Sequence, residues 1–342
     1  MKDERFLDSW QENEEEQIIN LSLRPQHLGE FIGQRNVISS LEISIEAAKK
    51  RSEPLEHLLL SGPPGLGKTS LAHCVAHHMD AKLTATSGPA IERAGDLVGI
   101  LTNLEEGDIL FIDEIHRLSR AIEEFLYPAM ENFQIDFVID KGPYAKSVKF
   151  NLKPFTLIGA TTRKGLLSAP LRGRFGLFFD FDFYSADDLS QIVKRSAHLL
   201  EIKIDDESSF EIARRARGCP RLCNRLLRRV RDYAQVIGEG VINPDMASSA
   251  LNSVGVDNKG LDDMDRKYLA AIIKIHNGGP AGIEAIAASL GEDKGTLEDV
   301  VEPYLLKEGF IIRSPRGRIA TEISHQHLNI PYPKEEKQEK FF

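Results

Sequence analysis

Cysteine and tryptophan are scarce in this chain, which has three cysteines and one tryptophan among its 342 residues. The cysteines, Cys74, Cys219 and Cys223, are too few for a disulfide framework, and their number agrees with a reducing compartment. Cys219 and Cys223 are one helical turn apart, but the sequence offers no further ligands at a spacing that suits zinc. We therefore interpret the cysteines as buried or inert thiols.

Long apolar runs and a positive net charge are also missing. No apolar run approaches the roughly 20 residues that a membrane helix needs. The first residues, MKDERFLDSWQENEEEQ, are acidic and polar and do not resemble a signal peptide, so we expect a cytoplasmic protein with no membrane partner. The formal net charge of −9 argues against a chain that binds nucleic acid over its whole surface. Any contact with DNA must come from a local basic patch.

Short apolar runs alternate with amphipathic segments through the first half of the chain. We predict strands at residues 57–62, 82–88, 108–114, 155–162 and 176–183. Helical patterns separate these strands, and the order predicts an α/β fold, in which helices cover both faces of a parallel sheet. Residues 133–155 interrupt the order with two alternating runs around the turn signal KGP, which predicts an inserted β-hairpin.

The pattern changes after Tyr184. Residues 185 to about 254 show helical patterns only, each beginning with a capping residue or a proline. The segments that follow have the order helix, helix, helix, strand, turn, strand, which is that of a winged helix-turn-helix. We predict an acidic, mostly disordered lead at 1–20, a large α/β domain at 21–184 with the hairpin at about 133–153, a small helical domain at 185–255, a winged-helix domain at 256–332 and a charged tail at 333–342.

The stretch GPPGLGKTS, residues 62–70, fits the phosphate-binding pattern G-x-x-x-x-G-K-[ST] and lies between a predicted strand and a predicted helix. Glycines in such a loop allow backbone N–H groups to converge on phosphates. Lys68 would neutralise the outer phosphates of a nucleotide, and Thr69 would ligate Mg²⁺. The alternative is a glycine turn with an unrelated lysine, and the flanking strand and helix argue against it.

Polar residues end two further predicted strands. In ILFIDEIH, Asp113 would hold the Mg²⁺ shell, and Glu114 would orient or deprotonate the attacking water. An Asp-Glu pair alone is typical of a helix N-cap as well, but its position after a phosphate loop favours catalysis. In LIGATTR, Thr161 and Thr162 either position that water and sense the γ-phosphate or cap the strand end.

Several arginines have no evident acidic partner. Arg172 and Arg174 lie in APLRGRFGL, which contains no acidic residue. Arg221 lies in the first turn of the arginine-rich helix PRLCNRLLRRVRD, and we select it as a candidate for contact with a nucleotide. A phosphate would supply the missing negative charge, whereas simple capping of a helix end is the alternative for Arg172 and Arg174.

Together, GPPGLGKT, ILFIDEIHRL, LIGATTR, LRGRFG and GCPRLCNR resemble the AAA+ ATPases. The stretches LRPQHLGEFIGQ, DLVGILTNLEEGDILFIDEIHRL and EDVVEPYLLKEGFIIRSPRGRIAT narrow the resemblance to the AAA+ motors that drive branch migration of four-way (Holliday) DNA junctions. This resemblance covers about residues 21–321. It implies an ATPase and helicase of homologous recombination and DNA repair that uses ATP, ADP and Mg²⁺.

The resemblance also implies site residues. It places Leu23 and Arg24 beside the adenine, Gly65, Lys68, Thr69 and Ser70 at the phosphates, and Glu131, Asn132, Phe133 and Tyr184 around the base. Arg221 would contact the γ-phosphate from the helical domain, and Arg174 would contact the γ-phosphate of a neighbouring subunit. The implied catalytic residues are Lys68, Asp113, Glu114, Thr161 and Arg174, and the implied metal ligands are Thr69 and Asp113.

Partners follow from the same resemblance. The chain would form a homo-oligomeric ring, a hexamer by resemblance, on duplex DNA beside a four-way junction. The hairpin at about 133–153 would bind a junction-binding partner protein, and a junction resolvase would join the complex. The winged-helix domain would contact DNA through Arg313 and Arg318. Acidic residues precede this short basic wing, so we expect weak and strongly salt-dependent DNA binding.

Two other functional classes compete with the DNA motor. A protein-remodelling or clamp-loading AAA+ ATPase would share the ATPase residues and use the winged helix for protein contact, but the arginine-rich wing RSPRGR favours DNA phosphates. A small-molecule P-loop kinase has no need of a helical domain and a winged helix, and it leaves Arg174 without a role. We favour the DNA motor and keep the remodelling ATPase as the alternative.

Overall fold

The computed structural model describes residues 21–138 and 147–333. The predicted disordered lead, the turn of the hairpin at 139–146 and the tail from residue 334 onward lie outside the described residues. The described chain forms two compact units, one of residues 21–201 with 218–225 and the other of residues 202–217 with 226–333. Each unit is described by itself below.

The first unit is built on a five-stranded sheet with the order β2-β3-β6-β1-β7. Its strands are β1 (Leu58–Ser61), β2 (Leu83–Ser87), β3 (Ile109–Asp113), β6 (Thr156–Thr161) and β7 (Leu177–Asp180). Every adjacent pair in this sheet is parallel. The predicted α/β fold with a parallel sheet is therefore confirmed.

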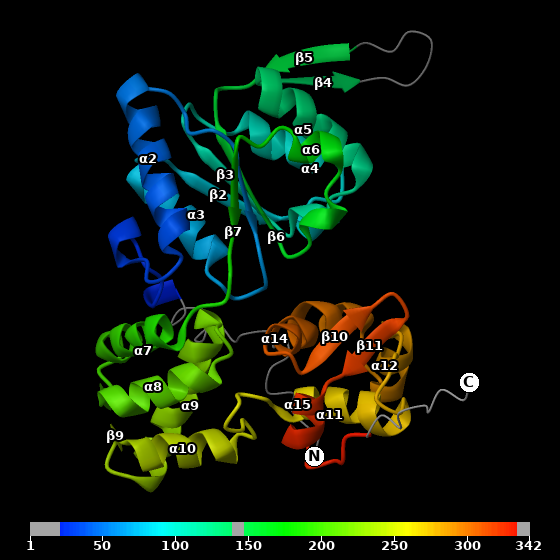
Figure 1. Cartoon of the computed structure of the whole chain (residues 1–342). Coiled ribbons are helices and arrows are strands. Elements are labelled where there is room, and N and C mark those ends of the chain that lie inside the picture. Colours follow the sequence, from blue (N-terminus) through cyan, green and yellow to red (C-terminus); the bar gives the residue numbers. More distant parts are fainter. Residues whose placement is uncertain (1–20, 139–146, 334–342) are drawn as a thin grey trace, which may run out of the picture. The chain divides into compact units, whose positions relative to one another are not determined.

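Helices cover both faces of this sheet, which explains why its central strands β1, β3 and β6 are almost entirely buried. Leu110 and Ile112 of β3 belong to a buried cluster with residues of α4 and α5. Ile109 and Phe111 are one residue out of phase and face the other side, where α2 and α3 lie (Figure 1). The helices of this unit are α2 (Arg35–Arg51), α3 (Lys68–His78), α4 (Ala94–Thr102), α5 (Arg120–Asn132), α6 (Ala169–Arg172) and α7 (Ala186–Leu199).

An antiparallel strand pair lies where the sequence predicts the hairpin. β4 (Gln134–Val138) pairs with β5 (Ser147–Asn151), and Gln134 lies opposite Asn151. The pair directly follows α5, which ends at Phe133 in a left-handed conformation.

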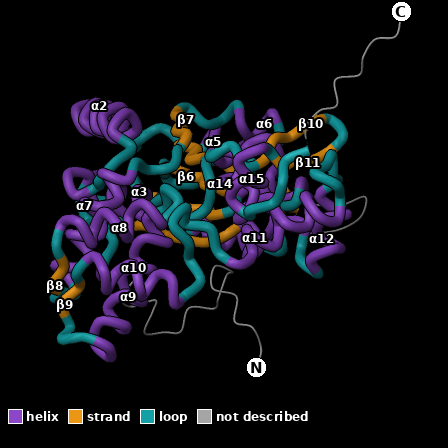
Figure 2. The backbone as a smooth tube through the Cα atoms, turned by 60° about the horizontal axis from the view of Figure 1, so that its bottom comes forward, coloured by secondary structure: helices purple, strands orange, loops and turns teal. Residues whose placement is uncertain are grey.

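Short strands and helices make up the second unit. Its helical part has α8 (Asp206–Arg215) and α10 (Pro244–Ser253), and the long helix α9 (Pro220–Ile237) runs from one unit into the other. The prediction of helices only is wrong here, because β8 (Lys203–Ile204) and β9 (Val241–Ile242) form a parallel pair (Figure 2). Two-residue strands carry no alternating pattern that a sequence could display.

The remainder of the second unit has the predicted winged-helix order. It comprises α11 (Asp263–Ala270), α12 (Ile283–Leu290), α13 (Lys294–Thr296), α14 (Glu302–Lys307), β10 (Ile311–Ser314) and β11 (Gly317–Ala320), with π-helical turns at Ala271–Ile275 and Leu297–Val301. A final helix, α15 (Glu322–His327), was not predicted. Tyr268, Ile286, Leu305 and Ile311 contribute to one buried core under the strands.

Arg217 joins the helical part of the second unit to its winged helix. Its Nε donates to the carbonyl of Gly260 at 2.6 Å, and its Nη1 donates to Asp265 at 3.1 Å. The guanidinium also lies 5.7 Å from the ring centre of Tyr304. Burial disfavours the charge, but Asp265 and Asp262 outweigh it and raise the pKa of Arg217. A buried cation of this kind persists only because it is paired.

No helix among residues 21–138 and 147–333 is both long and apolar enough to cross a bilayer.

His57, just before β1, is hydrogen-bonded to two backbone groups, and the one that donates to Nδ1 favours the neutral ring. The N–H of Leu157 donates to Nδ1 at 2.9 Å, so the ring proton resides on Nε2, which donates to the carbonyl of Met130 at 3.1 Å. The ring also packs against Phe133 and Phe155, at centroid distances of 6.4 and 5.6 Å. Burial lowers the pKa of His57 below its usual 6.5.

This arrangement predicts a pH-dependent stability. Because the folded chain resists protonation of His57 and the unfolded chain does not, the stabilisation is complete above about pH 6.5 and is lost as the pH falls toward the folded pKa. His57→Gln should lower the midpoint of urea unfolding at pH 8 and flatten its decline below pH 6.5. His198→Gln, at an exposed histidine of α7, is the control and should leave the profile unchanged. An identical decline in wild type and His57→Gln would contradict the assignment.

Candidate active site

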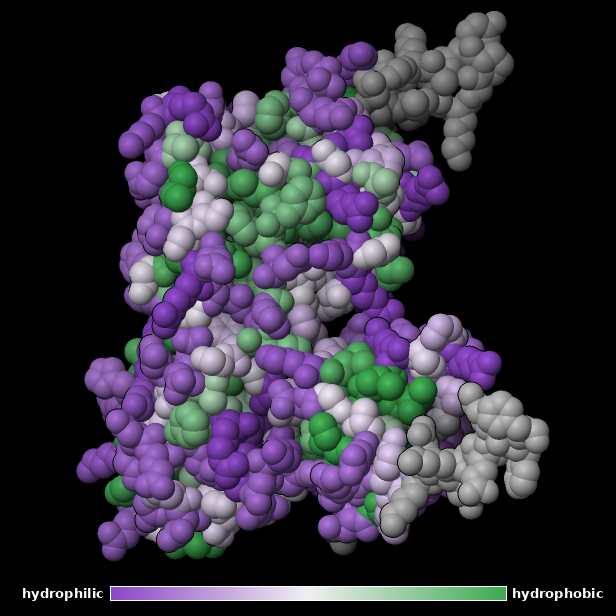
Figure 3. Space-filling model, in the orientation of Figure 1, coloured by the Kyte–Doolittle hydropathy of each residue, from purple (hydrophilic) through white to green (hydrophobic). Residues whose placement is uncertain are grey.

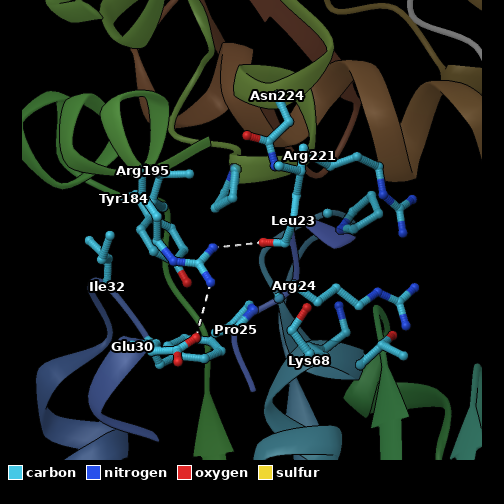
Figure 4. Close-up of a pocket in the computed structure, with 18 of the residues that line it drawn as sticks. Leu23, Arg24, Pro25, Glu30, Ile32, Lys68, Tyr184, Arg195, Arg221 and Asn224 are labelled. Atoms are coloured by element: carbon cyan, nitrogen blue, oxygen red, sulfur yellow. Dashed lines mark hydrogen bonds and ion pairs between the residues drawn. The ribbon is translucent and has the colours of Figure 1, made fainter. Parts of the chain in front are cut away.

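A cavity opens at the carboxyl ends of β1 and β3, lined entirely by residues of the first unit. Parallel strands direct their carboxyl ends to the same edge, so the loops that follow them meet there. Ten of the predicted site residues line this cavity: Leu23, Arg24, Gly65, Lys68, Thr69, Ser70, Asp113, Glu114, Tyr184 and Arg221. Figure 4 shows Leu23, Arg24, Lys68, Tyr184 and Arg221 around it.

The loop between β1 and α3 forms the phosphate end of the cavity. Gly62, Gly65 and Gly67 have φ angles of 144°, 78° and 99°, which only glycine adopts readily. The loop directs the amino end of α3 toward the cavity, where backbone N–H groups favour an anion. Lys68 donates to the carbonyls of Gly62 and Pro63 at 2.8 and 2.9 Å. Burial lowers its pKa, and the carboxylates of Asp113 and Glu114 oppose that effect.

Glycine is required at position 65 for a second reason, because the segment that begins α9 packs closely against it. A Cβ at Gly65 would lie 2.6 Å from Sγ of Cys219 and 3.2 Å from Cβ of Arg221. The N–H of Arg221 also donates to the carbonyl of Gly65 at 3.3 Å. The backbone of the phosphate loop is therefore in direct contact with the backbone of Arg221, the residue predicted to bind the γ-phosphate.

Glu114 follows β3 in a left-handed conformation, with φ of 48°, and its carboxylate is fixed from two sides. Its Oε2 accepts from Oγ1 of Thr162 at 3.4 Å and lies 3.3 Å from Nδ1 of His116. His116 was not selected from the sequence, although it stands two residues after Glu114. Strain at a residue of this kind is typical of catalytic positions.

Thr161 has a different role in the structure from Thr162. Thr161 is fully buried, and its hydroxyl lies 2.9 Å from Nδ1 of His116 and accepts from the N–H of Arg163 at 3.0 Å. The hydroxyl that reaches Glu114 belongs to Thr162, because successive side chains of a strand point to opposite faces. Thr161 thus orients His116 from below the cavity and is not part of its lining.

The other end of the cavity is formed by the segment before α2. Leu23 is buried, and Nη1 of Arg24 lies 3.3 Å from Nε2 of His73. The hydroxyl of Tyr184 donates to the carbonyl of Leu66 at 3.0 Å, and burial raises its pKa. This mixture of an apolar wall and backbone groups suits a purine base.

Arg195 of α7 is a site residue that the sequence did not indicate. Its Nη1 donates to the carbonyl of Leu23 at 2.8 Å, and its Nη2 pairs with Glu30 at 3.0 Å (Figure 4). It fixes the chain beside the predicted adenine position to α7. The helical pattern of α7 alone gives no sign of this contact.

Arg174 and the segment at Glu131–Phe133 lie elsewhere. They are not among the described residues that line the cavity. Nη2 of Arg174 pairs with Glu131 at 3.0 Å, and its guanidinium stacks 4.3 Å from the ring centre of Tyr127. The arginine that lacked an acidic neighbour in the sequence therefore has one from α5.

The two arginines predicted to contact DNA face each other across the wing. Arg313 of β10 pairs with Arg318 of β11, and both bind the carboxylate of Glu302. Arg313 is about half exposed, whereas Arg318 is only 14% exposed. Arg316, which separates the two strands, is exposed.

The cavity has the donors that a nucleotide and Mg²⁺ require. Asp113 and Thr69 both line it, and Mg²⁺ prefers such oxygen ligands in addition to phosphate and water. Among residues 21–138 and 147–333, no three His, Cys, Asp or Glu side chains gather closely enough to hold a metal ion by themselves. The residues thus fit a metal that is bound together with the phosphates.

Comparisons with known proteins identify the family of the chain. Family models match residues 23–181 as the Holliday junction DNA helicase RuvB P-loop domain, 184–257 as the RuvB AAA lid domain and 258–329 as the RuvB C-terminal winged helix domain. A curated relative from Kosmotoga olearia, the Holliday junction branch migration complex subunit RuvB, is 58% identical over 96% of this chain and 95% of its own length.

Solved structures give the same result. The Thermotoga maritima RuvB Holliday junction branch migration motor has a TM-score of 0.85 and 49% identity, over 91% of this chain and 100% of that one. A point mutant of the same protein has a TM-score of 0.86 and 50% identity, over 91% of this chain and 99% of that one. The chain belongs to the RuvB family of Holliday junction DNA helicases.

Proposed function

We propose that this chain is an ATP-driven motor that moves the branch point of four-way DNA junctions. The observation that carries the proposal is the cavity in which Lys68, Asp113 and Glu114 meet, within a chain that also has a winged helix. The family membership supports ATP hydrolysis and DNA as the substrate. The remodelling ATPase is not favoured, since all three parts of the chain match RuvB models.

The residues at the phosphate end have separate roles in hydrolysis. Lys68 would exchange its two carbonyl partners for phosphate oxygens. Asp113 and Thr69 would hold Mg²⁺, which neutralises phosphate charge when bound. Glu114 would orient the attacking water and accept its proton, while His116 and Thr162 keep the carboxylate in place.

The active site would be completed by a second copy of the chain. Arg174 lies off the cavity of its own chain and is held by Glu131 and Tyr127. The edge strand β7 exposes Phe178, which is 53% accessible, and Figure 3 shows hydrophobic surface over β7. A neighbouring copy would cover this surface and receive Arg174 at its γ-phosphate, in a ring for which we propose six subunits.

The partners that we propose are DNA and two proteins. A RuvA-like junction-binding protein would contact the chain at the hairpin of residues 133–153, and a RuvC-like resolvase would act on the same junction. The resemblance of the sequence supports these assignments. The test is dissociation of a synthetic four-way junction, with ATP, in the presence and absence of the junction-binding partner. No junction processing under either condition would overturn the proposed function.

Substitutions at the phosphate end should separate binding from hydrolysis. Lys68→Ala removes the cation that faces the phosphates and should abolish binding of a fluorescent ATP analogue. Glu114→Gln should leave that binding intact and lower ATP hydrolysis by about 10²- to 10⁴-fold, the usual contribution of a general base. Glu124→Gln, at an exposed position of α5, is the matched control and should retain wild-type rates. Equal hydrolysis by wild type and Glu114→Gln would refute the role of Glu114.

Mixing of variants tests whether Arg174 acts between subunits. Arg174→Ala alone should lose about 10³-fold or more in ATPase rate, as expected for an arginine that stabilises a transferring phosphoryl group. Adding Lys68→Ala subunits, which are themselves inactive but keep Arg174, should restore part of the activity. Arg172→Ala, at the end of α6 and two residues before Arg174, is the control and should retain most of the activity. No recovery at any mixing ratio would contradict action in trans.

A further inference from the structure

The wing between β10 and β11 carries three arginines, but its positive charge is compensated within the unit. Arg313 and Arg318 are direct cross-strand partners, and like charges in such positions repel each other. Glu302 of α14 and Glu298 of the preceding π-helical turn bring two negative charges to these two positive ones. α14 and the strands lie side by side (Figure 1).

Glu302 is the centre of this arrangement. Its side chain is 0% exposed, and its Oε1 accepts from Nε of Arg318 at 2.6 Å and from the hydroxyl of Tyr268 at 2.6 Å. Its Oε2 accepts from Nε of Arg313 at 3.0 Å and from Nη2 of both arginines. One buried carboxylate thus holds both of the arginines that the sequence analysis assigned to DNA.

The carboxylate is ionised in the folded chain. Burial alone would raise the pKa of Glu302, but the hydrogen bonds from Arg318, Tyr268 and Arg313 outweigh it, and the pKa is lowered. Its negative charge is therefore present at neutral pH, next to both guanidinium groups.

The backbone of the wing is held at Gly317 and Arg318 by contacts with Ala281. Arg318 is paired with Arg313 in the ladder, and its N–H and carbonyl also bond to Ala281, at 2.8 and 2.9 Å. A Cβ at Gly317 would lie 2.3 Å from the carbonyl oxygen of Ala281, so the turn packs tightly against this segment. Any exchange of Glu302 for another anion must occur by rotation of the arginine side chains.

We propose that Glu302 is a positioning residue that limits the affinity of the wing for DNA, because its carboxylate competes with backbone phosphates for Arg313 and Arg318. The proposal rests on the DNA-motor function proposed above. Arg313, which is 51% exposed, meets a phosphate while still paired, and Arg318, which is 14% exposed, does so only after it leaves Glu302. Both contacts are weakened by the nearby negative charge.

The test is the affinity of the full chain for a labelled DNA duplex, measured by fluorescence anisotropy over a range of salt concentrations. Glu302→Gln keeps the shape and a hydrogen-bond acceptor but removes the charge. It should tighten binding about three- to tenfold at low salt and steepen the slope of log affinity against log salt by about 0.9 for each phosphate gained. A purely structural residue would not raise the affinity when it is replaced.

Two controls define the effect. Glu308→Gln, exposed at the far end of α14, makes the same change of charge and should alter the affinity less than about twofold. In Glu302→Gln/Arg313→Ala/Arg318→Ala the gain should disappear, because both of the released arginines are absent. Unchanged or weaker binding by a Glu302→Gln protein with wild-type thermal stability would overturn the proposal. If Glu302→Gln does not fold, the affinity of Glu298→Gln is measured instead. The proposal then requires that Glu298→Gln binds DNA more tightly than Glu308→Gln does.

The arginine variants separate this proposal from the proposed function. If Arg313→Ala and Arg318→Ala, in chains that fold, bind duplex as tightly as wild type, the wing is not the DNA contact, and that part of the proposed function fails together with the inference. If they bind more weakly but neither Glu302→Gln nor Glu298→Gln binds more tightly, only the inference about Glu302 fails.

Discussion

The common direction of the five strands is the constraint on which the active site depends. Parallel pairing places three groups at one edge of the sheet. They are the phosphate loop after β1, Asp113 and Glu114 at the end of β3, and the two threonines at the end of β6. None of these groups is near another in the sequence. If β3 paired antiparallel with β6, its acidic residues would lie at the opposite edge, and Lys68 would face no carboxylate. The direction of the strands thus determines which residues meet at the active site.

Local patterns predicted the parts of the structure that local physics determines. The five strands could be found because burial on both faces requires runs of apolar residues. The phosphate loop could be found because its positive φ angles require glycine. Asp113 and Glu114 could be found because they stand at the end of a predicted strand. Arg195 could not, since its partners Leu23 and Glu30 are 172 and 165 residues away. The β8–β9 pair was missed because two residues form no period. His116 had a local signal, its place after Glu114, but its role depends on Thr161 of another strand.

Arg174 shows how a charge that has no acidic neighbour in the sequence is stabilised within the single chain. Glu131 and the face of Tyr127 stabilise its guanidinium in the single chain, while its Nε is buried without a hydrogen-bond partner in the described structure. The side chain of Glu131 is 51% accessible, and an ion pair with one solvated partner contributes little, on the order of 1 kcal/mol, so a phosphate with greater charge can replace Glu131. The pairing within the chain and the proposed contact between chains are therefore two states of one side chain.

Exposure to solvent distinguishes two paired arginines of the second unit, Arg217 and Arg313. Arg217 is only 7% exposed and is paired with Asp262 and Asp265, so its pairing serves the fold. Arg313 is paired as closely but remains half exposed, so its partner is exchangeable. A motor must release each phosphate that it binds, and a carboxylate that recovers the arginine lowers the free-energy cost of that release. The weak binding that we propose for the wing would in this sense favour movement along DNA, and the burial of the carboxylate keeps it beside the arginines.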